Sequence, residues 1–183
     1  MQPTARVRRC DRSSIRVLFD LAEQIDGDLV RLEVGEPDFD TPAHVKEAAV
    51  AAIEAGETNY TSNAGLPDLR VAIAETLARE YGHSYGADDV LVTTGGMEAL
   101  HLACLAVLEP GEDLLIPSPG WPNYWTQARL ADATPVEVPM DFPYDLDADR
   151  VIDRMGPDTG AVMLCSPSNP TGRVFERAGA AVD

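Results

Sequence analysis

Helical and extended segments alternate from residue 41 to residue 164, and this alternation limits the possible folds more than any other feature of the chain. Apolar residues recur at helical spacing over 41–56, 67–82, 97–108, 121–131 and 146–155. Short aliphatic or β-branched runs predict strands at 90–94, 114–116, 134–138 and 161–164. Because strands that alternate with helices require crossover connections, the sequence predicts an α/β three-layer sandwich with a mainly parallel sheet.

Two of the predicted helices carry start and stop signals. The hydroxyl of Thr41 is expected to cap the first of them, with Pro42 at the first helical position. The segment Gly65-Leu66-Pro67 is expected to open the next helix, and Gly82 and Gly86 to close it.

The charge of the chain restricts its partners. Acidic residues outnumber basic residues by 31 to 14, so the formal net charge is −17, although residues 1–16 carry a charge of +4. A body this negative repels nucleic acid and anionic membranes. Lys46 is the only lysine. This composition is typical either of a protein adapted to a high-salt cytoplasm or of an ordinary acidic protein from a GC-rich genome.

The apolar stretches and the cysteines favour a cytoplasmic protein without a metal site. The longest apolar stretch, residues 99–108, contains a histidine and is too short to span a bilayer. The cysteines Cys10, Cys104 and Cys165 are far apart and match no metal-ligand spacing. We therefore expect unpaired thiols in a reducing compartment.

Loops rich in glycine, proline or hydroxyl residues follow three of the predicted strands. They are Thr93–Gly96, Ser118–Trp121 and Ser166–Gly172. In parallel sheets, ligands bind at the carboxyl ends of the strands, and a glycine turn that opens a helix attracts anions. Each loop also has a simpler interpretation, as a tight turn, a core aromatic or a proline-rich turn. Earlier in the chain, Gly35 is able to present bare backbone, and Tyr60 is either a phenolic donor or a packing residue.

Taken in this order, the segments resemble the fold-type I aminotransferases of the aspartate aminotransferase class over residues 13–175. The sharpest matches are Gly-Glu-Pro-Asp-Phe-Asp-Thr-Pro at 35–42, Gly-Gly-Met-Glu-Ala-Leu at 95–100 and Ser-Pro-Ser-Asn-Pro-Thr-Gly at 166–172. The resemblance implies pyridoxal 5'-phosphate (PLP) as cofactor. It also implies transfer of an amino group between an amino acid and a 2-oxo acid, in a homodimer that shares its sites between subunits.

The resemblance assigns one group of residues to the cofactor phosphate. They are Gly95, Gly96, Met97 and Glu98, which match the loop that cradles the phosphate mainly through backbone N–H groups. Many relatives have a hydroxyl or amide side chain where Met97 and Glu98 stand. Tyr60 matches a tyrosine that reaches the phosphate of the partner subunit.

The resemblance assigns a second group to the cofactor ring and the substrate. Trp121 matches the aromatic residue stacked on the pyridine ring, and Asn169 matches the asparagine that hydrogen-bonds the 3-oxygen of the ring. Gly35 matches a backbone contact to the substrate carboxylate.

The family's Schiff-base lysine has no counterpart here, because the matching segment would lie beyond Asp183. We therefore expect a truncated chain that is inactive alone. Residues 1–40 are predicted to be an N-terminal arm and small-domain segment, and residues 41–183 the first half of the PLP-binding large domain of the fold. Two alternatives stay open: a PLP-dependent lyase or synthase of the same fold, and a non-catalytic remnant or dimerisation module.

Overall fold

The computed structural model describes residues 2–11, 14–32 and 35–176. Arg12 of the basic N-terminal segment and the last seven residues of the predicted large domain therefore lie outside the described residues. The contacts divide the chain into two compact units. We call residues 35–99 the helical unit, and residues 1–34 together with 100–183 the sheet unit. The predicted domain boundary at residue 40 stays a prediction.

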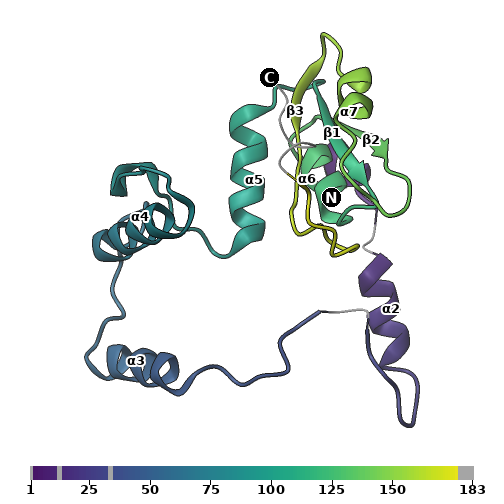
Figure 1. Cartoon of the computed structure of the whole chain (residues 1–183). Coiled ribbons are helices and arrows are strands. Elements are labelled where there is room, and N and C mark those ends of the chain that lie inside the picture. The colour runs from purple at the N-terminus through teal and green to yellow at the C-terminus, as the bar shows by residue number, and fades with distance from the viewer. Residues whose placement is uncertain (1, 12–13, 33–34, 177–183) are drawn as a thin grey trace. The chain divides into compact units, whose positions relative to one another are not determined.

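The sheet unit is built on three parallel strands, which confirms the predicted sheet type (Figure 1). They are β1 (Asp113–Ser118), β2 (Thr134–Pro139) and β3 (Thr159–Val162). The central strand is β1, and its Leu115 lies opposite Val136 of β2 and Val162 of β3. Strand β3 begins two residues before the predicted range of 161–164.

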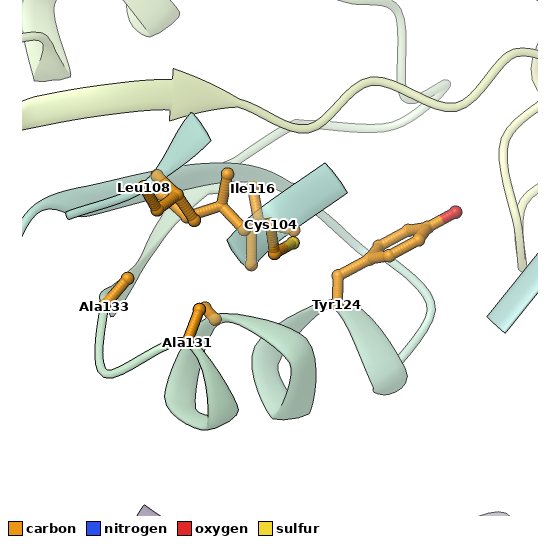
Figure 2. Packing of buried hydrophobic residues seen from close by; sticks show 8 residues of the cluster. Cys104, Leu108, Ile116, Tyr124, Ala131 and Ala133 are labelled. Atoms are coloured by element: carbon orange, nitrogen blue, oxygen red, sulfur yellow. The ribbon is translucent and has the colours of Figure 1, made fainter. Parts of the chain in front are cut away.

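Helices cover both faces of this sheet, as a three-layer sandwich requires. On one face, Leu114 and Ile116 pack with residues of α5 (Gly96–Val107) and α6 (Asn123–Leu130). Figure 2 shows this cluster, with Cys104 and Ile116 at its centre. On the other face, Leu115 packs with Val138 and with the α7 helix (Ala148–Arg154). Successive residues of a strand point to opposite faces of the sheet, so β1 contributes side chains to both clusters.

The helical unit contains α3 (Ala43–Glu54), α4 (Pro67–Tyr81) and the short 3-10 helix η1 (Ala87–Asp89). As predicted, α4 opens at the segment that ends in Pro67. Of the two predicted closing glycines, Gly82 is the C-cap that follows Tyr81: it adopts the left-handed conformation at φ +72° and donates its N–H to Ala78. Gly86 lies beyond the helix. The expected Thr41 cap is wrong. Pro42 occupies the N-cap position, where no side chain caps the helix, and the Thr41 N–H bonds to the Asp40 carboxylate.

The predicted strand at residues 90–94 is also wrong, because these residues join no ladder in the described part of the chain. Their β-branched side chains favour extended backbone, but a strand exists only where a neighbour pairs with it. Here the segment instead packs against the turn before α4. The Val92 N–H donates to Ala64, and a Cβ on Gly65 would lie 2.6 Å from Val92.

The N-terminal segment contributes α1 (Ala5–Arg8) and α2 (Ser14–Ala22). Helix α1 has no buried residue, yet it contacts α6. Ion pairs make this contact: Arg6 and Arg9 both pair with Asp132, just after α6. Exposed pairs of this kind are each weak and are screened by salt.

No helix in the described parts of the chain combines the length and apolar character needed to cross a membrane. The same residues contain no group of three or more His, Cys, Asp or Glu side chains that could hold a metal ion.

We expect salt to stabilise the fold as a whole while it loosens α1. Raising KCl from 10 mM to 1 M shortens the Debye length from about 30 Å to about 3 Å, which screens the self-repulsion of a chain with a net charge of −17. The gain should be on the order of 1 kcal/mol, or roughly 0.5 M in the urea midpoint for an m-value of about 2 kcal/mol/M. Urea denaturation at both KCl concentrations measures this shift, with sorbitol at equal osmolality as the control. An unchanged midpoint would rule out adaptation to high salt.

Candidate functional site

The turn before α5 has the backbone geometry that a phosphate-binding loop needs. Gly95 has φ +78°, a conformation that side-chain-bearing residues rarely adopt, and its N–H donates to Thr93 over 2.8 Å. Apart from the adjacent residues and the backbone of α5 itself, no atom lies within 4 Å of the position that a Cβ would take on Gly95 or Gly96. An anion could therefore approach the backbone closely, near the first turn of α5 and the positive end of its dipole.

Glu98 opposes this role electrostatically. Its carboxylate accepts a hydrogen bond from the Thr94 N–H, so it occupies one of the amides of the turn. A carboxylate in the first helical turn is favourable for the helix dipole, but it repels a second anion. The open space at the two glycines thus fits a phosphate. Two backbone N–H groups of the turn must first be released to bind it: that of Thr94 from the Glu98 carboxylate, and that of Gly95 from the Thr93 carbonyl.

Trp121 lies in the loop after β1, in the sheet unit. It is partly buried, and its ring meets the ring of Tyr124 edge to face, with centroids 5.5 Å apart and an angle of 85° between the planes. The Tyr124 N–H also donates to the Trp121 carbonyl over 3.0 Å. The helix predicted from residue 121 begins at Asn123, so Trp121 belongs to the loop and not to the helix.

Asn169 lies in the loop after β3, in the same unit, and is exposed. The loop folds back on itself: the Gly172 N–H donates to Ser168, and the Ser168 N–H donates to Arg173, each over 2.7 Å. Asn169, Ser168 and Tyr124 line one narrow cavity of about 10 Å³. This volume is at the lower limit of what a single water molecule needs.

The predicted site residues are divided between the two units. The sheet unit contains Trp121 and Asn169, and the structure connects both of them to Tyr124. The helical unit contains the turn at 95–98 together with Gly35 and Tyr60, both of which are exposed. The roles assigned to these residues stay predictions.

Tyr124 and Cys165 are the residues that the sequence analysis did not connect with the site. Tyr124 is 8% exposed, and burial, followed by a side-chain hydrogen bond with Cys165, raises its pKa to about 12. The spacing from Trp121 to Tyr124 is a signal that could have identified this tyrosine, because residues three apart meet around a helix start. No sequence signal pairs Tyr124 with Cys165, which lies 41 positions further along the chain.

A second, more open cavity of about 500 Å³ lies beside α6 in the sheet unit. Trp125, Arg129 and Glu137 line it, together with Asp11 from the N-terminal segment. Arg129 pairs with Asp11 over 3.2 Å. None of the predicted site residues lines this cavity.

Lys46, the only amine side chain of the sequence, lies on α3. Its ammonium group pairs with the carboxylate of Asp40, and its side chain is about half exposed. It belongs to the helical unit, whereas Trp121 and Asn169 belong to the sheet unit.

Comparison with known proteins identifies the family. The family model of class I and II aminotransferases matches residues 27–179. The bifunctional aspartate aminotransferase and glutamate/aspartate-prephenate aminotransferase of Petunia hybrida is 47% identical over 151 residues, which are 81% of this chain and 32% of that protein. The aspartate aminotransferase of Pyrococcus horikoshii is 37% identical over 174 residues, which are 94% of this chain and 44% of that protein.

Solved structures agree with this result. The aspartate aminotransferase of Thermus thermophilus with maleate has a TM-score of 0.92 and 38% identity, over 98% of this chain and 48% of that chain. The aspartate aminotransferase of Rhizobium meliloti has a TM-score of 0.90 and 36% identity, over 98% and 46%. The chain thus spans less than half the length of each of these relatives. By its sequence and its fold, the chain belongs to the class I and II aminotransferase family.

Proposed function

We propose that this chain provides part of the cofactor site of a PLP-dependent aminotransferase, which transfers an amino group from an amino acid to a 2-oxo acid. The observation that carries the proposal is the position of Trp121 and Asn169. Each lies in a loop that follows a strand of the parallel sheet, and the structure connects both to one buried tyrosine. In open α/β sheets, this edge is where ligands bind.

Each residue then has a definite task. The backbone N–H of Gly96 would bind the phosphate, joined by the N–H of Gly95 once it leaves the Thr93 carbonyl. The Trp121 ring would stack on the pyridine ring. The Asn169 amide donates a hydrogen bond to the ring's 3-oxygen. When bound, PLP supplies an electron sink for the bonds at the substrate α-carbon. Gly35 presents its backbone to the substrate carboxylate.

We further propose that the protein acts in the cytoplasm as a homodimer in which Tyr60 reaches the phosphate of the partner subunit. The full exposure of Tyr60 is compatible with a residue that contacts a second chain. A PLP-dependent lyase or synthase with the same fold would use the same cofactor contacts, so substrate assays must distinguish these reactions.

A non-catalytic role is the second candidate. Lys46, the only lysine of the 183 residues, is paired with Asp40 on α3. A chain that binds PLP without a lysine at the site would serve as a binding or dimerisation module.

Cofactor binding tests the proposal directly. The first variant is Trp125→Phe, which leaves Trp121 as the only tryptophan. In this variant we expect PLP to quench the fluorescence of Trp121, because the cofactor ring would stack on the indole. In the matched variant Trp121→Phe, PLP should not quench the fluorescence of the remaining Trp125, which lines the separate 500 Å³ cavity. Pyridoxal without phosphate should bind more weakly than PLP.

Glu98→Gln provides a second arm of the same experiment. Removing the carboxylate that holds the Thr94 N–H should tighten PLP binding about threefold to fivefold, which corresponds to a charge–dipole effect of about 0.7–1 kcal/mol. Glu75→Gln, an exposed residue of α4, is the control for the loss of one negative charge. Quenching that is equal at both tryptophans, or equal binding of pyridoxal and PLP, would refute the proposed site.

A further inference from the structure

We propose that Tyr124 is a positioning residue that holds the Trp121 ring and the loop of Asn169 in a fixed relative arrangement. The inference rests on the proposed function, since it concerns the two residues of the sheet unit that are assigned to the cofactor ring. It assigns a role to a residue that is not itself expected to contact the cofactor.

Tyr124 holds Trp121 in two ways. The backbone N–H of Tyr124 donates to the Trp121 carbonyl over 3.0 Å, which fixes the main chain at the start of α6. The two rings meet edge to face at 5.5 Å and 85°, which is a favoured geometry for aromatic pairs. Because Tyr124 is only 8% exposed, its own ring is held by the core and is a fixed surface for the indole.

The hydroxyl of Tyr124 holds the other loop. Figure 2 shows the Tyr124 hydroxyl pointing away from Cys104 and Ile116, at the end of the apolar cluster. Cys165 packs against the cluster that contains Tyr124 and lines the same narrow cavity, and its interaction with the Tyr124 hydroxyl contributes to the raised pKa of Tyr124. The Cys165 thiol in turn donates to the Pro167 carbonyl over 3.3 Å. Asn169 follows two residues later and lines the same narrow cavity as Tyr124 and Cys165.

The acidity of Tyr124 supports a positioning role over a catalytic one. Burial and the interaction with Cys165 raise the pKa of Tyr124 to about 12. At neutral pH the hydroxyl is therefore always protonated. It is a permanent hydrogen-bond donor and a poor general base.

The two contacts matter together because a planar ligand is held by two different constraints. Stacking on Trp121 sets the plane of the ring, while the Asn169 amide sets the direction of the 3-oxygen within that plane. These residues come from loops after different strands, so nothing in the local backbone fixes one relative to the other. A side chain that touches both loops supplies that constraint.

The test uses the full chain with Trp125→Phe and Cys10→Ser, so that Trp121 is the only tryptophan and Cys104, at 2% exposure, is the only other thiol besides Cys165. Tyr124→Phe keeps the ring and removes the hydroxyl, whereas Tyr124→Leu removes both. The readouts are near-UV circular dichroism and anisotropy of Trp121, the rate at which Cys165 reacts with a small disulfide reagent, and PLP affinity by quenching.

We expect the two variants to separate the two contacts. Tyr124→Phe should leave the Trp121 signals unchanged, while Cys165 reacts faster and PLP binds more weakly, each by about twofold to tenfold, as expected for one lost hydrogen bond. Tyr124→Leu should in addition reduce the Trp121 dichroism and anisotropy. Tyr144→Phe, which removes the hydroxyl of a partly buried tyrosine packed against the cluster on the opposite face of the sheet, is the matched control and should change none of these signals.

The outcomes distinguish this inference from the proposed function. If the parent chain does not bind PLP, the proposed function fails, but the Trp121 and Cys165 readouts still measure whether Tyr124 holds both loops. If Tyr124→Phe has the parent's thiol reactivity and PLP affinity, the hydroxyl does not position the Asn169 loop and the inference is wrong. If Tyr124→Leu does not fold, the comparison of Tyr124→Phe with Tyr144→Phe decides.

Discussion

The 183-residue chain, supplied with PLP, an amino acid and a 2-oxo acid in molar KCl, is expected to show no transamination above that of free PLP. The reaction requires a lysine amine that bonds to the cofactor and then carries the proton to and from the substrate α-carbon. The only candidate is Lys46, which lies on α3 and pairs with Asp40. A coupled assay for glutamate formation measures turnover, and borohydride trapping with peptide mapping identifies any amine that has bonded to PLP.

Lys46→Ala is the decisive control for this result. Because Lys46 is not expected to take part, the variant and the parent chain should give the same background rate. Turnover clearly above free PLP that disappears in Lys46→Ala would show that this lysine acts as the nucleophile.

Leu115→Ala is expected to cause a large loss of stability. Leu115 is 0% exposed at the centre of β1, where it packs with Val138 of β2 and Val151 of α7. Truncating a buried leucine costs about 2–5 kcal/mol, against a total stability of about 5–15 kcal/mol for a typical domain. Urea denaturation followed by far-UV circular dichroism should show a strongly lowered midpoint or a chain that is already unfolded.

Leu105→Ala is the matched control, because this leucine of α5 is 48% exposed. The same change of side chain should there cost less than about 1 kcal/mol, since surface substitutions have small effects. Equal losses in the two variants would mean that β1 is not the centre of the cooperative fold.

Much of the secondary structure could be predicted because the responsible signals are local. Gly82 ends α4 because a residue without Cβ adopts φ +72° at no steric cost, and that requirement is visible in the sequence alone. The helical period of the apolar residues similarly predicted α5 and α6 to within a few residues. The parallel sheet followed from chain connectivity, since strands separated by helices need crossovers.

The failed predictions concern features that depend on a partner elsewhere in the chain. Residues 90–94 have strong β propensity, but a strand needs a neighbour, and in the structure Val92 meets the Gly65 turn instead. Thr41 has a suitable capping hydroxyl, but Pro42 takes the N-cap position and the helix begins one residue later. In both cases, the local preference was real and the surrounding contacts decided the outcome.

For the candidate site, the sequence by itself determined which residue types stand in which loops: the glycine turn at Gly95, the aromatic Trp121 and the amide Asn169. Only the tertiary structure decided what these residues touch. It placed the Glu98 carboxylate on the Thr94 amide, and it placed Tyr124 between Trp121 and Cys165. Backbone conformation and apolar period are set by neighbours in sequence, whereas the distance between side chains on separate elements is set by how those elements pack.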